Sequence, residues 1–141
     1  MSDSVIEHSA TCVCRRAGTP FVGKQGFTYA AAISAETAGA SAIHMQLLTV
    51  PPGARAKAHK HEAHETAIYV LTGDVGMYYG EKLENHMVTR AGDFVYIPAN
   101  TPHLPYNMSQ TEPARRAVIS RTDPNEQESV VLLPELDAIH S

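Results

Sequence analysis

The feature that most constrains the fold is a series of short, strand-like segments separated by turn residues. Nine prolines and nine glycines interrupt the 141 residues, and no segment keeps a convincing 3.6-residue apolar period. This pattern predicts an all-β chain, an antiparallel sandwich or small barrel. The expected strands are residues 11–16, 27–33, 43–50, 55–61, 66–72, 75–80, 86–90, 94–98, 103–107, 114–121 and 128–133.

The length indicates a single domain, since a chain of this size buries roughly 70% of its unfolded surface. We expect the barrel core at about residues 27–133, with loose termini at 1–10 and 134–141, although the tail could form a helical turn. Residues 34–42 are expected to form a loop, with a helix as the alternative that their alanines allow. No repeat or low-complexity linker divides the chain.

Composition limits which binding partners and which cellular compartment are expected for this chain. The formal net charge is -4, which argues against nucleic acid or an anionic membrane as the main partner. No apolar run reaches the roughly 18 residues that span a bilayer, and the first residues lack the order of a signal peptide. We expect a cytoplasmic protein in which Cys12 and Cys14 are reduced, because neighbours on one strand face form a disulfide only with strain.

The densest chemistry lies in residues 53–73. His59 and His61 are one residue apart, so on a strand they point to the same face, where both could bind one ion. A third imidazole, His103, follows a strand and a proline-framed turn in residues 92–107. These three side chains are the predicted ligands of one divalent transition metal ion.

The same two stretches resemble the two signature motifs of the cupin superfamily, which comprises small jelly-roll barrels that usually hold one metal ion. The first motif is GxxxxxHxH, then three or four residues, Glu, six residues and Gly, and its matching positions are Gly53, His59, His61 and Gly73. The second is GxxxxxPxGxxHxxxN, and its matching positions are Gly92, Pro98, His103 and Asn107. The motifs are about 18 residues apart and cover about a quarter of the chain. The resemblance implies an antiparallel jelly-roll β-barrel (a double-stranded β-helix) of the small monocupin type.

The chain departs from the second motif at Asn100, which stands where the motif has Gly; Asn adopts the left-handed conformation more readily than most residues. The larger departure concerns the acidic ligand of the first motif. If six residues separate the acidic position from Gly73, that position is Thr66. If three residues separate it from His61, it is Glu65.

Strand alternation frames the choice of a fourth ligand. A strand that is regular from His64 turns His64 and Thr66 inward and Glu65 outward, whereas a bulge before Thr66 would turn Glu65 inward. The fourth ligand is therefore Glu65, His64, Gln46 or water. A Glu ligand suits Fe, Mn or Ni, and neutral ligands alone favour Zn, Cu or Ni, so the pattern leaves Zn, Mn, Fe and Ni open.

Several other residues are candidates for the pocket. Arg55 and Lys57 are an even number of positions from His59, so on an unbroken strand they would lie on the same face as the predicted ligands and favour an anionic substrate. The alternative is that they lie at a solvated strand end. Gln46 shares a strand face with His44, either on a half-exposed surface or in the pocket.

Near the second motif, Tyr106 lies three residues after His103 and is the tyrosine expected nearest the ligand. Asp93 and Asn107 are expected to shape turns, with Asn107 bracing the loop that carries His103.

The resemblance implies a metal-dependent enzyme that acts on a small oxygenated organic molecule, of the dioxygenase, isomerase or cyclase type. The alternative is a non-catalytic barrel that binds or senses a small molecule, because fold alone does not fix function. Barrel faces rich in Val, Ile and Leu commonly pair, so we also expect a homodimer.

Overall fold

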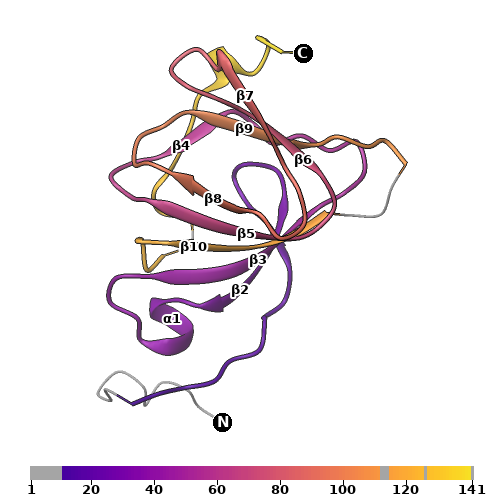
Figure 1. Ribbon diagram of the computed structural model, residues 1–141. Coiled ribbons are helices and arrows are strands. Elements are labelled where there is room, and N and C mark those ends of the chain that lie inside the picture. The colour runs from indigo at the N-terminus through magenta and orange to yellow at the C-terminus, as the bar shows by residue number, and fades with distance from the viewer. Residues whose placement is uncertain (1–10, 112–114, 126, 141) are drawn as a thin grey trace.

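The computed structural model describes residues 11–111, 115–125 and 127–140, which form two facing antiparallel sheets (Figure 1). The six-stranded sheet has the order β1 (Phe21–Val22), β2 (Thr28–Ile33), β3 (His44–Val50), β10 (Arg115–Arg121), β5 (Thr66–Thr72) and β8 (Phe94–Ile97). The five-stranded sheet has the order β11 (Val130–Leu132), β4 (His59–His61), β9 (His103–Asn107), β6 (Val75–Tyr79) and β7 (Asn85–Thr89). The chain is therefore an all-β jelly roll in one domain, as predicted.

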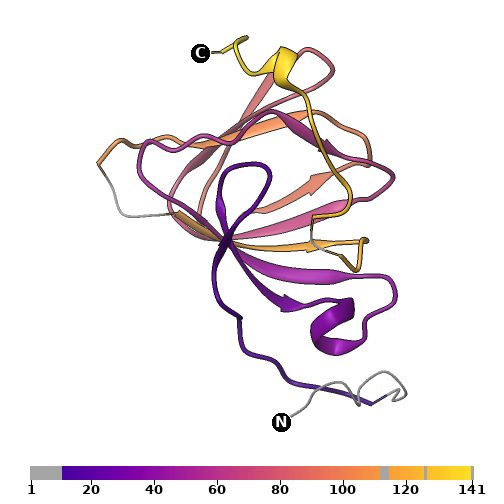
Figure 2. The same cartoon turned by 180° about the vertical axis from the view of Figure 1, so that it is seen from behind.

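The core lies between the two sheets because successive side chains of each strand alternate in direction. On β3 the buried residues are His44, Gln46, Leu48 and Val50. The six-stranded sheet contributes one apolar cluster that includes Phe27, Leu48 and Ile119, and a second cluster joins Met77 of β6 to Val95 and Ile97 of β8. Figure 2 shows from behind that the turn between β1 and β2 reaches toward the other sheet, where Lys57 N–H donates to the Gln25 carbonyl.

Asn100 adopts the expected left-handed conformation, with φ 64°. Its backbone N–H donates to the His61 carbonyl at 3.0 Å, and its side-chain oxygen accepts from Ala63 N–H at 3.0 Å. The turn before β9 is thus tied to the end of β4, which brings the two histidine-bearing segments together.

Two local expectations are wrong. Residues 11–16 form no strand; the side chain of Arg15 instead donates to the Thr37 carbonyl, and the sheet begins at β1. Residues 34–42 contain a short helix, α1 (Ala35–Ala38), whose N-terminus is capped by Ser34 and Thr37 in a capping box.

No helix in the described ranges is long and apolar enough to cross a membrane.

Residues 134–140 differ from the expected loose tail. Pro134–Leu136 form a 3-10 helix, and Leu136 is buried against Leu83 and Leu104. The Asp137 carboxylate accepts the backbone N–H of Ala58 at 2.6 Å, just before β4. The tail therefore packs on the sheet that carries His59 and His61.

Candidate metal centre

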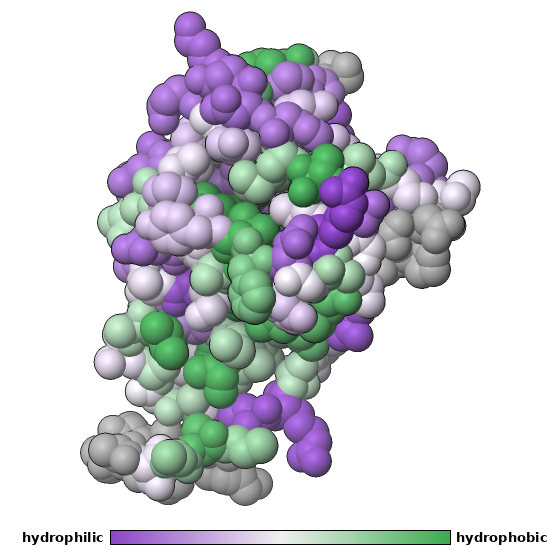
Figure 3. Space-filling model, in the orientation of Figure 1, coloured by the Kyte–Doolittle hydropathy of each residue, from purple (hydrophilic) through white to green (hydrophobic). Residues whose placement is uncertain are grey.

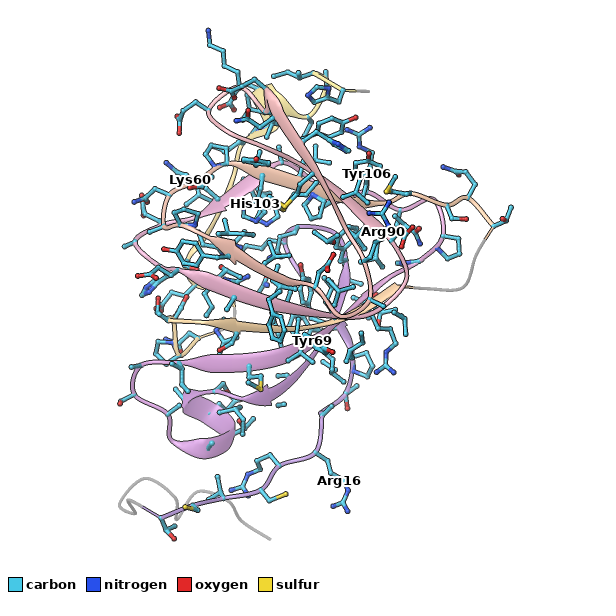
Figure 4. The ribbon with its side chains drawn as sticks, viewed as in Figure 1. Arg16, Lys60, Tyr69, Arg90, His103 and Tyr106 are labelled. Atoms are coloured by element: carbon cyan, nitrogen blue, oxygen red, sulfur yellow. The ribbon has the colours of Figure 1, made fainter. Side chains whose placement is uncertain are left out.

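The structure brings His59, His61 and His103 together inside the barrel. On β4 the two histidines are buried and the intervening Lys60 is half-buried, and His103 begins β9 directly opposite His59 (Figure 4). One ring nitrogen from each of the three lies within 4.8 Å of the others. Small shifts of the three side chains would bring these nitrogens within bonding distance of one ion, so this cluster could hold a metal ion.

Hydrogen bonds fix which nitrogen each ring presents. Nδ1 of His59 donates to the Lys57 carbonyl at 2.7 Å, and Nδ1 of His103 donates to the Thr101 carbonyl at 2.9 Å. Nδ1 of His61 lies 3.3 Å from the Ser129 hydroxyl, while its buried Nε2 has no hydrogen-bond partner in the described chain. Since a carbonyl only accepts, His59 and His103 keep their Nε2 lone pairs, and each ring is oriented as in metal sites.

Burial keeps these imidazoles neutral. Desolvation lowers the pKa of His59 and of His61 well below the usual range, and lowers the pKa of His103 to about 4. The positive charge of Arg121 lowers all three pKa values further. At neutral pH the lone pairs are therefore available to a metal without loss of a proton.

Neither Glu65 nor His64 joins the cluster. The Glu65 side chain is exposed and accepts a hydrogen bond from Tyr96 Oη at 3.1 Å, and His64 lies against the Thr122 hydroxyl. β5 begins at Thr66, which pairs with Ile97 and Arg121 without a bulge before it. Thr66 is therefore the first inward residue of the strand, and Glu65, which precedes the strand, has its side chain exposed.

Sequence reasoning missed the buried partner of Thr66. Arg121, at the end of β10, donates from Nε to Thr66 Oγ1 at 2.8 Å and from one terminal nitrogen to His44 Nε2 at 3.4 Å. The signal was present in the chain, because Arg121 shares parity with Ala117 and Ile119, the inward residues of the same strand.

The predicted cations Arg55 and Lys57 are exposed instead. β4 comprises only His59–His61, so the alternation that would have aligned all four residues is interrupted, and Ala56 and Ala58 are the buried ones. The solvated alternative is therefore correct for these two side chains.

Tyr106 also lies outside the barrel (Figure 4). Its hydroxyl contacts His86 Nε2 at 2.8 Å, and its ring stacks on Tyr78. It is three positions after the inward His103, an odd offset, so the two side chains leave β9 on opposite faces.

Gln46 does point inward, and neither of its amide atoms finds a hydrogen-bond partner in the described chain. Asp93 accepts Arg90 N–H, as expected of a turn residue. Asn107 donates to the carbonyls of Val50 and Pro51. It thus braces the turn before the first motif rather than the loop that carries His103.

A cavity of about 60 Å³ lies between the sheets, with largely apolar walls. The polar side chains that line it are Gln25, His59, Thr66, Thr89, His103, Arg116 and Arg121. No carboxylate is among the described residues that line it. The imidazoles of His59 and His103 and the Arg121 guanidinium thus line one small space between the sheets.

The family model for the cupin domain matches residues 46–120, more than half of the chain and the part that holds both histidine segments. The chain belongs to the cupin family. No curated protein sequence matches this cupin significantly.

Solved structures of oxalate decarboxylase resemble this cupin at low identity. The Bacillus subtilis enzyme at pH 4.6 has a TM-score of 0.70 and 15% identity over 91% of this chain and 34% of its own. The Lactobacillus farciminis formate complex has a TM-score of 0.67 and 18% identity over 82% and 33%. A Bacillus subtilis structure from work on the Mn(II) centres has a TM-score of 0.67 and 22% identity over 81% of this chain and 29% of its own. The chain spans about a third of these proteins, and the likeness shows the fold.

Proposed function

We propose that this cupin binds one divalent transition metal ion through the Nε2 atoms of His59, His61 and His103, and acts as an enzyme on a small oxygenated organic molecule. The observation that carries the proposal is the convergence of three neutral, buried imidazoles, one of which has an Nε2 without a partner in the described chain. A buried polar nitrogen left unpaired costs about 1–3 kcal/mol, and coordination would remove that cost.

The side chains support Lewis-acid chemistry over redox chemistry. With Thr66 in place of an inward carboxylate, the protein ligands are neutral and the ion would keep its full charge. Such an ion polarises a carbonyl or acidifies bound water. The chain's own residues would position the substrate: the apolar walls exclude bulk water, and Arg121 offers polar contacts in the cavity. This favours the isomerase or cyclase type and zinc or nickel; the Mn(II) centres of the structural neighbours place manganese in the test as well.

The alternative is a metal-containing barrel that binds or senses its ligand without turnover. The observation that favours it is the cavity lining, in which the described residues include no Asp or Glu to move a proton. Tight binding of a ligand panel without turnover by the metal-loaded protein would support this alternative over the enzyme.

The test is metal content. Purified protein is stripped with a chelator, dialysed against Zn, Mn, Fe or Ni, and analysed for bound metal. One equivalent is expected for the wild type and far less for His61→Ala, with His86→Ala, an exposed histidine on β7, as the matched control. Wild-type protein that binds none of the four metals would overturn the proposal.

A further inference from the structure

Arg121 is a buried cation that makes no ion pair with a described residue, and the charge of Asp123 acts on it only from beyond ion-pair distance. Its side chain is 4% exposed, and within the described ranges no carboxylate lies at ion-pair distance from the guanidinium. Asp123 is also buried, but its two oxygens accept the backbone N–H groups of Asn125 and Ser129 in its own loop. A charge inside a protein is costly unless it is paired. Asp123 offsets part of this cost at a distance, and an anion in direct contact with the guanidinium would offset more.

The neutral partners of Arg121 orient it and leave donors free. Thr66 Oγ1 accepts from Nε, and His44 Nε2 accepts from a terminal nitrogen while His44 Nδ1 donates to the Asp123 carbonyl. A guanidinium has five N–H donors, and the other three make no hydrogen bond to the described residues. Burial lowers the pKa of Arg121 to about 10, which still leaves it cationic at neutral pH.

The free donors lie at the predicted metal centre. His44, Arg121 and Thr66 are register partners across β3, β10 and β5, so their side chains form one inward row. Arg121 and Thr66 line the same cavity as His59 and His103. Where the cupin motif has Glu, this chain has Thr66, whose hydroxyl accepts a hydrogen bond from Arg121.

We propose that a small monocarboxylate binds in this cavity, with its oxygens on the free donors of Arg121 and next to the imidazoles of His59 and His103. The ligand, and not a side chain, then supplies the negative charge of the site. The inference rests on the proposed metal function and specifies its substrate class. The planar guanidinium matches a carboxylate in a two-bond contact. A cavity of about 60 Å³ admits only a few non-hydrogen atoms, and its apolar walls suit a short alkyl substituent.

Coupling between metal and anion provides the test. Cobalt(II) is titrated into stripped protein with and without acetate and followed by visible absorption, with phosphate as a second anion. Acetate is expected to tighten cobalt binding by tenfold or more and to change the spectrum, and by reciprocity cobalt tightens acetate binding. Arg121→Met is expected to lose this coupling, whereas Arg55→Met, which removes an exposed guanidinium, keeps it.

A second variant keeps the test decisive if Arg121→Met does not fold. Thr66→Glu places a carboxylate opposite Arg121, so it is expected to bind cobalt tightly without acetate and to show no acetate effect. In the absence of metal, acetate should raise the melting temperature of the wild type and not that of Thr66→Glu.

The outcomes separate the two proposals. Absence of cobalt binding overturns the metal function, while the metal-free melting shift still reports on the anion site. Cobalt binding that acetate does not alter overturns the anion site, as does an undiminished acetate effect in Arg121→Met or Thr66→Glu. A phosphate effect equal to that of acetate overturns the carboxylate class.

Discussion

The three histidines hold their rings in place through hydrogen bonds that do not depend on a metal. His59 and His103 each donate from Nδ1 to a backbone carbonyl two residues earlier in the chain. This geometry is set by the backbone, so the ligand atoms are preorganised. The cost is electrostatic, because burial disfavours the protonated form of every ring.

Acid pH should therefore destabilise the metal-free protein. In the unfolded chain these histidines titrate near pH 6.5, whereas in the folded chain the pKa of His103 is about 4 and those of His59 and His61 are also lowered. Between these values the unfolded state binds more protons, so stability is complete above pH 6.5 and falls as the pH drops toward 4. The slope is about 1.4 kcal/mol per pH unit for each group. Urea denaturation from pH 7 to pH 4.5 measures it, and a free energy of unfolding independent of pH would contradict it.

Gln46 offers a second prediction at the scale of one side chain. Its amide is buried with neither atom bonded to the described chain, and replacing such a group with an apolar one of similar shape is neutral or stabilising. Gln46→Met should raise the free energy of unfolding of the ligand-free protein by up to about 1 kcal/mol. Leu47→Met, on the other face of β3, is the control. A loss of more than 1 kcal/mol in Gln46→Met alone would show that the amide has a structural partner.

Among the elements, the tail contributes to the site without touching its cavity. The 3-10 helix buries Leu136 beside Ala58, and Asp137 holds the backbone N–H of the residue that precedes β4. The position of His59 thus depends on residues more than seventy places later in the chain.

Removing the apolar contact of the tail should be costly. Leu136→Ala is expected to lower the free energy of unfolding by about 2–3 kcal/mol, because it leaves a cavity in the core. Ile139→Ala, at an exposed position in the same tail, should change it by less than about 0.5 kcal/mol. Chemical denaturation of both variants makes the comparison. Equal effects would mean that the tail does not pack as described.

Sequence reasoning succeeded where an element was regular. Alternation put His59 and His61 on one face of a strand, and put Gln46 on the same face as His44, because side-chain direction follows directly from an unbroken strand. It left open whether the face of Gln46 is buried, and His103 was joined to the pair by the spacing of the second motif. For Arg55 and Lys57 it left a pocket position and a solvated strand end open, and the interrupted strand makes the solvated end correct. It could not decide the turn that separates β4 from β5. Arg121 was overlooked because a terminal Arg on a strand is usually solvated, and only pairing with β3 and β5 shows it to be covered.

For the whole molecule, the outer face of the six-stranded sheet carries exposed apolar side chains. β8 is an edge strand, and its Phe94 is 82% exposed, with its ring 4.7 Å from that of Tyr69 on β5. Figure 3 shows apolar residues gathered in patches among polar ones on this view of the surface. Exposed apolar patches of this kind mark association sites, which supports the predicted homodimer.

The dimer prediction has a direct test. Sedimentation velocity should give about twice the 15.3 kDa chain mass, and Phe94→Glu should shift the protein to the monomer because it places a charge in an apolar contact. Val22→Glu, at a residue 71% exposed on the opposite edge of the same sheet, is the control. A wild-type monomer, or a dimer unaffected by Phe94→Glu, would contradict the prediction.

The pairing of β4 with β11 has a consequence for the order of events in synthesis. His59 and His61 are register partners of Leu132 and Val130, so the histidine strand, which has β9 on its other side, gains this second neighbour only after the ribosome has made residue 132. Long-range pairing of this kind forms late, since the loop between the partners must close first. A nascent chain that already displays all three histidines therefore lacks the strand on one side of β4, and we expect the proposed metal binding to follow translation of β11.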